Sequence, residues 1–342
     1  MKVLATLLAV AVLAGCSSEQ PAAKTEAPAA KAPTGVGSIE RTDPAFNALV
    51  PSDAVIEKVA GGFGFTEGPL WRPSNELWFS DLFANAVRSV TPDGNAKILI
   101  EVAGGKTDAP PGSYNGPNGM IADKDGAVLV AQHNDRRIAR INKDLSITGV
   151  VERFEGKRFN SPNDLVYTAD GSLYFTDPPY GLLKQDEDPA KELKFNGVYR
   201  FAGGKVTAVV RDMTRPNGIG FSPDGKVAYI ANSDPQKKLW MRYDVAANGS
   251  LSNGRVFADV TSSAEPGLPD GLKLDSEGNL YATGPGGVWV YAPDGKLLGK
   301  IKTPEPPANV GWGEDGKVLY ITAGPSVYRI RTAVAGQKML YQ

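Results

Sequence analysis

The chain has 342 residues, of which 42% are hydrophobic, and a formal net charge of −1. This apolar content is ample for a large folded core. Lysines and arginines are scattered rather than clustered, so the composition excludes a polybasic surface for nucleic acid or for an anionic membrane. We therefore expect no nucleic-acid partner.

The first 15 residues have the features of an export signal. Lys2 precedes a short apolar stretch, residues 3–14, which is too short to span a bilayer as a permanent helix. The sequence Leu-Ala-Gly-Cys at 13–16 resembles a bacterial lipobox, and Cys16 is the only cysteine. We prefer this interpretation to an ordinary secretory signal with an incidental cysteine. It predicts cleavage before Cys16, lipidation of Cys16 and contact with the membrane through that lipid anchor alone.

The sequence predicts two further segments after the signal. Residues 16–44 are rich in Ala, Pro, Lys, Glu and Thr, and we expect them to form a disordered tether. Residues 45–342 form the folded domain, which has no cysteine for a disulfide and must be held by its core. We expect a monomer that is exported and anchored at the bacterial cell envelope, facing the periplasm, with the outer membrane as the expected location.

A pattern that recurs six times dominates the folded domain. Each copy has a small or proline-containing turn, one Glu, Asp or Asn, a short apolar strand, a polar turn and a second apolar strand. The acidic or amide residues that begin the copies, which we call the ring residues, are Glu67, Asn118, Asn163, Asn217, Asp270 and Asn309. The following turns end at Asn75, Gly126, Gly171, Gly225, Gly278 and Gly316, eight residues later in five copies and seven in the last. This fixed offset indicates one repeated structural unit.

The repeat predicts an all-β fold, a six-bladed β-propeller with four antiparallel strands per blade. Each unit reads as a hairpin, because Asp-Gly and Glu-Gly pairs supply the positive φ angles of tight turns. Further strand-like runs follow in each period, and no long segment after the signal has persistent helical periodicity. A β-sandwich or an open β-barrel would not explain six hairpins with one offset.

The ring residues are expected to face one mouth of the central channel, because the first strand of each propeller blade lines the axis. Asn-Gly and Asp-Gly also occur as turn dipeptides, but here they precede the hairpin turn by eight residues, and Glu67 is a poor turn residue. Two carboxylates and several amide oxygens suit a hard divalent cation. Ca²⁺ is the expected ion, and ligand type alone leaves Mg²⁺ or Mn²⁺ open.

The chain resembles the senescence-marker-protein/gluconolactonase/luciferin-regenerating family, most closely its bacterial gluconolactonase-like branch. The matching motifs are FTEGPLW at 65–71, NSPNDL at 160–165, YFTDPPYG at 174–181, RPNG at 215–218, PDGL at 269–272 and GGVWV at 286–290. This resemblance implies a metal held by four side chains, those of Glu67, Asn163, Asn217 and Asp270. It also implies calcium as the usual metal, with zinc or manganese accepted by some members.

The resemblance further implies hydrolysis of a small cyclic ester, a lactone, by water. It places the general base at Asp270, while direct attack by Asp270 and a base at Glu67 stay open as alternatives. A sugar lactone is the expected substrate. A phosphoesterase or arylesterase on the same metal, or a non-catalytic binding propeller, are the competing functions. Two carboxylates at one mouth favour an enzyme over a binding module.

Other polar residues are expected near the substrate. His133 is the only histidine, and its surroundings resemble a Glu-His-Gly-Asn-Arg-Arg stretch of gluconolactonase-like proteins, although Gln132 and Asp135 depart from it. A substrate-binding or proton-shuttling role and a plain hydrogen-bonding role both stay open for His133. The second strands should also bring Asp81, Asp177 and Asn232 to this mouth. The residues predicted to bind substrate are Asn118, His133, Asp164, Arg158, Arg215, Tyr180 and Asn309.

Overall fold

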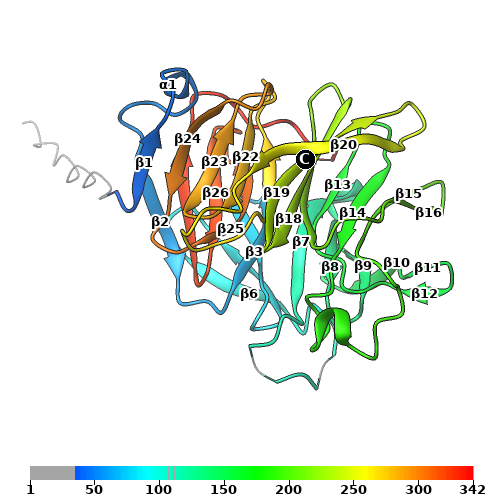
Figure 1. Cartoon of the computed structure of the whole chain (residues 1–342). Helices are drawn as coiled ribbons and strands as arrows, with labels where there is room; N and C mark the ends of the chain where they lie inside the picture. The colour runs from blue at the N-terminus through cyan, green and yellow to red at the C-terminus, as the bar shows by residue number, and fades with distance from the viewer. Residues whose placement is uncertain (1–34, 107, 111, 342) are drawn as a thin grey trace, which may run out of the picture. The chain divides into compact units, whose positions relative to one another are not determined.

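A computed structural model describes residues 35–106, 108–110 and 112–341 (Figure 1). The predicted signal, the lipidation site Cys16 and the tether up to residue 34 lie outside the described residues. In the part of the chain that is described, no helix is long and apolar enough to cross a membrane.

Six antiparallel sheets of four strands or more follow one another along the described chain, so the predicted six-bladed propeller is confirmed (Figure 1). We number the blades in chain order. Blade 1 contains β3 (Thr66–Arg72), β4 (Glu76–Asp81), β5 (Ala86–Val90) and β6 (Ala96–Glu101). Blade 2 contains β7 (Pro117–Ala122), β8 (Val128–Gln132), β9 (Arg137–Ile141) and β10 (Ile147–Val151). Blade 3 contains β13 (Leu165–Tyr167), β14 (Leu173–Asp177), β15 (Gly197–Ala202) and β16 (Lys205–Val210).

The second half of the chain repeats this order. Blade 4 contains β17 (Pro216–Phe221), β18 (Val227–Asp234), β19 (Lys237–Val245) and β20 (Leu251–Asp259). Blade 5 contains β21 (Leu272–Leu274), β22 (Leu280–Gly284), β23 (Gly287–Tyr291) and β24 (Leu297–Lys302), and blade 6 contains β25 (Pro307–Gly313), β26 (Val318–Ala323) and β27 (Ser326–Arg331). The first strands β7, β17 and β25 are buried throughout, whereas the fourth strands β6 and β20 are largely exposed. The first strand of each blade is therefore the inner one.

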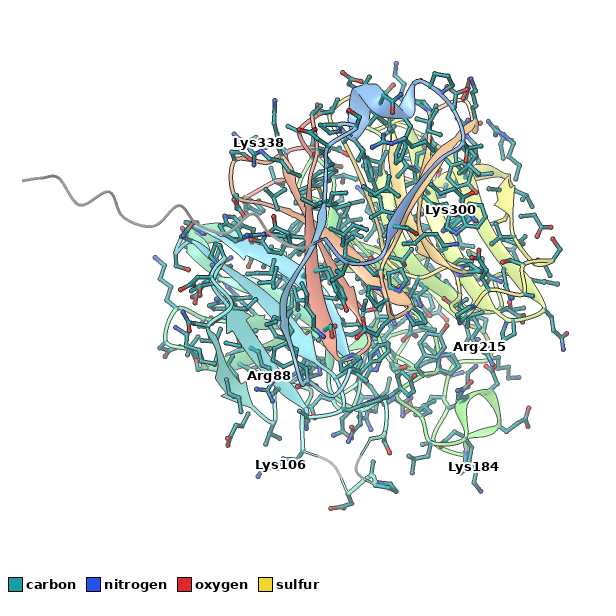
Figure 2. The ribbon with its side chains drawn as sticks, turned by 90° about the vertical axis from the view of Figure 1, so that its left-hand side faces the viewer. Arg88, Lys106, Lys184, Arg215, Lys300 and Lys338 are labelled. Atoms are coloured by element: carbon teal, nitrogen blue, oxygen red, sulfur yellow. The ribbon has the colours of Figure 1, made fainter. Side chains whose placement is uncertain are left out.

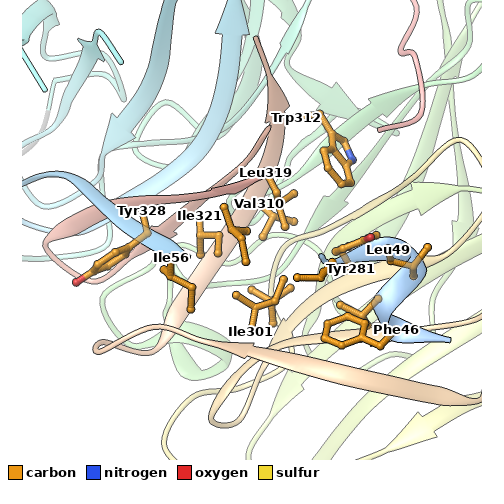
Figure 3. Packing of buried hydrophobic residues seen from close by; sticks show 14 of the residues in the cluster. Phe46, Leu49, Ile56, Tyr281, Ile301, Val310, Trp312, Leu319, Ile321 and Tyr328 are labelled. Atoms are coloured by element: carbon orange, nitrogen blue, oxygen red, sulfur yellow. The ribbon is translucent and has the colours of Figure 1, made fainter. Parts of the chain in front are cut away.

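Blade 6 takes its fourth strand from the start of the domain. Strand β2 (Ile56–Gly61) pairs with β27 in antiparallel register, with Ile56 opposite Ile330. This pairing joins the two ends of the repeat array and leaves no gap between the first and last blades. Ile56 lies in a buried apolar cluster with residues of β25, β26 and β27 (Figure 3).

The segment just before β2 corrects the predicted tether boundary. Strand β1 (Ser38–Arg41) adds to the outer edge of blade 5 by pairing with β24, so ordered structure begins before residue 45. Backbone hydrogen bonds to an exposed sheet edge hold this strand, and such pairing leaves little trace in composition. The prediction that residues 38–44 belong to a disordered tether was therefore wrong.

Helices are minor in the described residues, as the periodicity predicted. Helix α1 (Phe46–Leu49) is a single turn whose Phe46 and Leu49 side chains are buried in the same cluster as Ile56 (Figure 3). Two 3₁₀ turns, η1 (Lys124–Gly126) and η2 (Gln185–Glu187), lie in loops. A two-residue hairpin, β11 (Arg153–Phe154) with β12 (Lys157–Arg158), connects blades 2 and 3.

The C-terminal segment, residues 335–341, lies across one mouth of the channel. The Gln337 amide donates to the Leu274 carbonyl at 3.0 Å, and the rings of Tyr341 and Tyr167 meet with centroids 5.3 Å apart. Leu274 and Tyr167 end inner strands, whereas the ring residues begin them, so this mouth is opposite the ring. Figure 2 shows Lys338 in the upper part of the view and Lys184 at its lower edge.

The pairing of β2 with blade 6 predicts that the neighbouring residues Ile56 and Val55 contribute very differently to the free energy of unfolding. Ile56 is 2% exposed and Val55 is 40% exposed. We expect Ile56→Ala to lower the free energy of unfolding by about 2–5 kcal/mol, because it leaves a cavity in the cluster that joins β2 to the last blade. Val55→Ala, the matched control, should change it by less than about 0.5 kcal/mol. Urea denaturation of both variants measures the difference, and equal small losses would contradict the closure by β2.

Candidate functional site

The ring residues lie where the inner strands begin, and irregular strand pairing aims them. The register of the first two strands shifts at Glu67 in blade 1, at Asn118 in blade 2, at Asn217 in blade 4 and near Asn309 in blade 6. A β-bulge bends the strand and re-aims a side chain. The ring residues of blades 3 and 5 come just before β13 and β21, outside the regular pairing of these strands with β14 and β22.

The six strand starts meet around the axis through contacts between neighbouring blades. A Cβ atom added at Gly68 would lie 2.3 Å from the carbonyl oxygen of Asn118, and one at Gly218 would lie 2.3 Å from that of Asp270. The Gly119 amide donates to the Asn163 carbonyl at 2.9 Å. Glycine after the ring residue therefore allows adjacent blades to approach this closely, and the ring residues converge.

Glu67 and Asn309 meet across the closing blades. The Glu67 carboxylate is 2% exposed and accepts hydrogen bonds from Asn309 Nδ2 at 2.9 Å and from the Gly68 amide at 2.7 Å. Asn309 Oδ1 accepts from the Val310 amide at 2.8 Å, so both ends of the Asn309 side chain have protein partners. Asn309 was predicted to bind substrate; the structure places its side chain against Glu67.

Burial sets the protonation of the two ring carboxylates. Desolvation raises the pKa of Glu67 to about 7, although the hydrogen bonds from Asn309 and Gly68 oppose the rise. Desolvation also raises the pKa of Asp270 well above its usual value, and repulsion from Glu67 and Asp164 adds to the effect. These carboxylates are therefore close enough to repel each other. A positive charge between them would favour their ionised forms.

The donor set at the ring fits a hard cation. Glu67, Asn163, Asn217 and Asp270 supply only carboxylate and amide oxygens, and the Asn163 side chain has no hydrogen-bond partner among the described residues. Among those residues, no group of three or more His, Cys, Asp or Glu side chains is arranged to hold a metal. A site here would therefore depend on amide oxygens beside the two carboxylates.

Asn118 and His133 form a buried pair. His133 is fully buried, its Nδ1 lies 3.0 Å from the Tyr114 carbonyl oxygen and its Nε2 lies 3.2 Å from Asn118 Nδ2. A carbonyl only accepts, so Nδ1 carries the proton and Nε2 accepts from the Asn118 amide. Asn118 Oδ1 is then turned the other way, and it is buried without a partner among the described residues. His133 thus orients Asn118.

Asp164 lies deeper in the channel than the ring. Its carboxylate accepts from the Ile219 amide at 3.2 Å and lies 3.8 Å from the Lys273 ammonium. Beyond this pair is a cavity of about 40 Å³, lined by residues of five inner strands and by Met339 and Leu340 of the C-terminal segment. That volume suits only water. Asp164 therefore belongs to the channel wall, not to the open mouth.

The structure separates the remaining predicted substrate residues. The Tyr180 hydroxyl is buried beside Ser233 and Asn217 without a hydrogen bond in the described structure, and burial raises its pKa. Arg215 forms an ion pair with Asp186 of η2, next to the Tyr180 loop. Arg158 lines a surface cavity of about 230 Å³ with Arg137 of β9, Arg153 of β11 and the loop residues Asp135 and Glu152, and no ring residue lines this cavity.

The ends of the second strands have a structural role. The Asp81 carboxylate accepts from the Gly64 and Phe65 amides, and the Asp177 carboxylate accepts from the Asn160 and Ser161 amides at 2.8 Å. These bonds hold the chain that enters the inner strand. Asn232 does the same for the Arg215 amide in blade 4. None of the three reaches the channel as an open substrate contact.

Sequence reasoning did not identify Tyr114, Ser233 or Lys273. Tyr114 is 45% exposed, its ring meets those of Phe65 and Phe83, and the charges of Asp270 and Glu67 raise its pKa after desolvation. It therefore stands at the mouth of the site. Only the Lys273 position, three residues after Asp270 in an otherwise apolar inner strand, gives a signal in the sequence.

The burial of His133 predicts how it titrates. Desolvation lowers its pKa to about 4, while the unfolded chain has the ordinary value near 6.5. The unfolded state therefore binds more protons between these values, so the His133 contribution to stability is complete above about pH 6.5 and is lost as the pH falls toward 4. NMR of the single imidazole should show the neutral Nδ1–H form from pH 5 to 8. A midpoint near 6.5 in the folded protein would contradict this.

Comparison with known proteins agrees with the fold and the motifs. A family model described as the SMP-30/Gluconolactonase/LRE-like region matches residues 65–324. The gluconolactonase of Zymomonas mobilis is 37% identical over 315 residues, which cover 88% of each chain. Pentonolactonase XacC of Haloferax volcanii is 27% identical over 265 residues, 75% of this chain and 80% of that one.

A solved structure agrees as well. XC5397 from Xanthomonas campestris, described as a gluconolactonase important in glucose secondary metabolic pathways, superposes with a TM-score of 0.76 at 29% identity, over 88% of this chain and 96% of that one. The family match spans most of the propeller and includes all six of the predicted motifs in full. The chain belongs to the SMP-30/gluconolactonase/LRE-like family.

Proposed function

We propose that the protein hydrolyses small sugar lactones at the mouth formed by the ring residues. The observation that carries the proposal is the convergence of Glu67 and Asp270 with amide oxygens at one end of the channel, within a family whose relatives are named lactonases. The protein is accordingly a hydrolase of ester bonds. The reaction adds water across the ring C–O bond of a lactone and yields the open hydroxy acid.

A divalent cation, with Ca²⁺ as the expected ion, would be held by Glu67, Asn163, Asn217 and Asp270. The oxygen-only donor set and the repulsion between the two ring carboxylates support this ligand set. Zn²⁺, Mg²⁺ and Mn²⁺ are alternatives for the assay to separate. When bound, the cation would supply Lewis-acid polarisation of the substrate carbonyl.

Asp270 is the residue proposed to move the proton. It is partly exposed, whereas Glu67 is buried and committed to Asn309 and Gly68. As the water oxygen bonds to the lactone carbonyl carbon, Asp270 accepts the water proton. The ring C–O bond then breaks, and the proton passes from Asp270 to the departing oxygen. Direct attack by the Asp270 carboxylate is the alternative path to the same product.

Two groups on the chain could hold a sugar lactone during these steps. Asn118 Oδ1 is a buried acceptor without a partner among the described residues, and His133 keeps it in place. The Tyr180 hydroxyl, close to Asn217, is a buried donor that also has no hydrogen-bond partner among the described residues. An acceptor and a donor of this kind suit the hydroxyl groups of a sugar, which both donate and accept. Unpaired polar groups also disfavour substrates without hydroxyl groups.

The location stays a proposal as well. We propose that the protein is exported and carried on a lipid anchor at Cys16, facing the periplasm at the outer membrane. The lipobox-like sequence at 13–16 supports it. Loss of membrane association in a Cys16→Ser variant would bear it out.

The activity is tested by a substrate panel. Purified protein should open aldonolactones faster than aryl esters or phosphoesters, and a chelator should remove most of the activity. Added Ca²⁺ should restore it, and parallel additions of Mg²⁺, Mn²⁺ and Zn²⁺ identify the preferred ion. A pH-stat records acid release for every lactone. Lactone turnover that survives complete chelation would reject the metal, and turnover of aryl esters or phosphoesters alone would reject the substrate class.

The role of Asp270 is tested by substitution. We expect Asp270→Asn to lower kcat/KM by about 10³-fold. The neutral amide cannot accept the water proton, and it removes one negative charge from the proposed cation ligands. The domain should remain folded by circular dichroism. Asp294→Asn, in an exposed turn of blade 5, is the matched control and should retain full activity. An Asp270→Asn variant with near-normal turnover would exclude Asp270 as base and as nucleophile.

A further inference from the structure

Two blades use the same position to hold the amide of their ring residue. Strand registers place Pro117 opposite Gln132 in blade 2 and Pro216 opposite Asn232 in blade 4. The residues that follow each pair are therefore equivalent: Asn118 corresponds to Asn217, and His133 corresponds to Ser233. His133 accepts from the Asn118 amide, as described above. The same geometry in blade 4 assigns a partner to Asn217.

Ser233 connects Asn217 with the start of blade 5. It is 6% exposed, its Oγ accepts from Asn217 Nδ2 at 2.8 Å, and its hydroxyl donates to the Pro269 carbonyl. The direction of both bonds is fixed, because a carbonyl only accepts and an Nδ2 group only donates. Pro269 directly precedes Asp270.

The Ser233 hydroxyl therefore orients two proposed cation ligands, Asn217 and Asp270. With Nδ2 held by Ser233, the oxygen end of the Asn217 amide is turned away from blade 4's second strand. The bond to the Pro269 carbonyl holds the backbone from which Asp270 projects. Ligands that are oriented before the metal arrives lose less freedom on binding it.

We propose that Ser233 is a positioning residue for the cation site, which fixes the Asn217 amide oxygen and the Asp270 backbone in a geometry ready for a divalent cation. This inference rests on the proposed metal-dependent function. It adds a residue that touches neither the cation nor the substrate in the proposed mechanism. Ser233 therefore acts directly on cation affinity, and it affects turnover only because turnover depends on the bound cation.

The test compares Ca²⁺ binding in three variants by isothermal titration calorimetry of the whole domain. Ser233→Ala removes both hydrogen bonds and should weaken Ca²⁺ binding by about 10–100-fold. Ser233→Thr keeps the hydroxyl and should restore affinity to within a few-fold of the wild type. Ser89→Ala changes an equally buried serine in β5, the third strand of blade 1, and should leave Ca²⁺ affinity unchanged.

A second measurement separates positioning from folding. The melting temperature of metal-free Ser233→Ala should stay near that of metal-free wild type, while the rise on adding Ca²⁺ should shrink. At saturating Ca²⁺, kcat should recover most of its wild-type value. Wild-type Ca²⁺ affinity in Ser233→Ala, or no restoration by threonine, overturns the proposal.

The outcomes also distinguish this inference from the proposed function. Tight Ca²⁺ binding by the wild type with no lactone turnover rejects the substrate, while a weakened Ser233→Ala still supports the positioning role. Failure of the wild type to bind any of the four divalent cations rejects the metal site and the positioning role together.

Discussion

The close approach of the six inner strands around the axis is the constraint on which the site depends. A Cβ atom after Glu67 or after Asn217 would lie 2.3 Å from a carbonyl oxygen of the next blade, so only glycine permits the contact. The same approach brings six side chains from segments far apart in sequence to one end of the channel. Without it the blades could still form, but their ring residues would not converge.

This convergence buries charged groups, and hydrogen bonds and an ion pair from the surrounding residues partly offset the free energy of their desolvation. Desolvation raises the pKa of Glu67 to about 7, and hydrogen bonds from Asn309 and Gly68 oppose the rise. Deeper in the channel, Lys273 lies 3.8 Å from the Asp164 carboxylate and offsets its charge. Asp270 keeps partial exposure, and among the described residues it has no comparable cation beside it, which agrees with the proton transfer proposed for it.

The blades share a scaffold but differ at a few equivalent positions, and these differences define the site. One such position comes directly after the last residue of the second strand that pairs with the first strand. It is occupied by His133 in blade 2, Ser233 in blade 4 and Leu82 in blade 1. The first two hold an amide, whereas Leu82 is a buried apolar residue. Asp81, at the end of the second strand, holds incoming backbone. A repeated architecture thus supplies geometry, and single substitutions supply the chemistry.

The sequence alone determined the blade count, the inner strands and the ring residues, because turn chemistry and strand alternation are local and recur at a fixed offset. It could not reveal that β1 and β2 complete blades 5 and 6, since backbone pairing between distant segments leaves no local pattern. Nor could it show the bond from Asn309 to Glu67, whose partners are 242 residues apart, or the bond from Ser233 in blade 4 to the Pro269 carbonyl at the start of blade 5. Hydrogen-bond partners across blades depend on how the ring closes, and only the tertiary structure decided them.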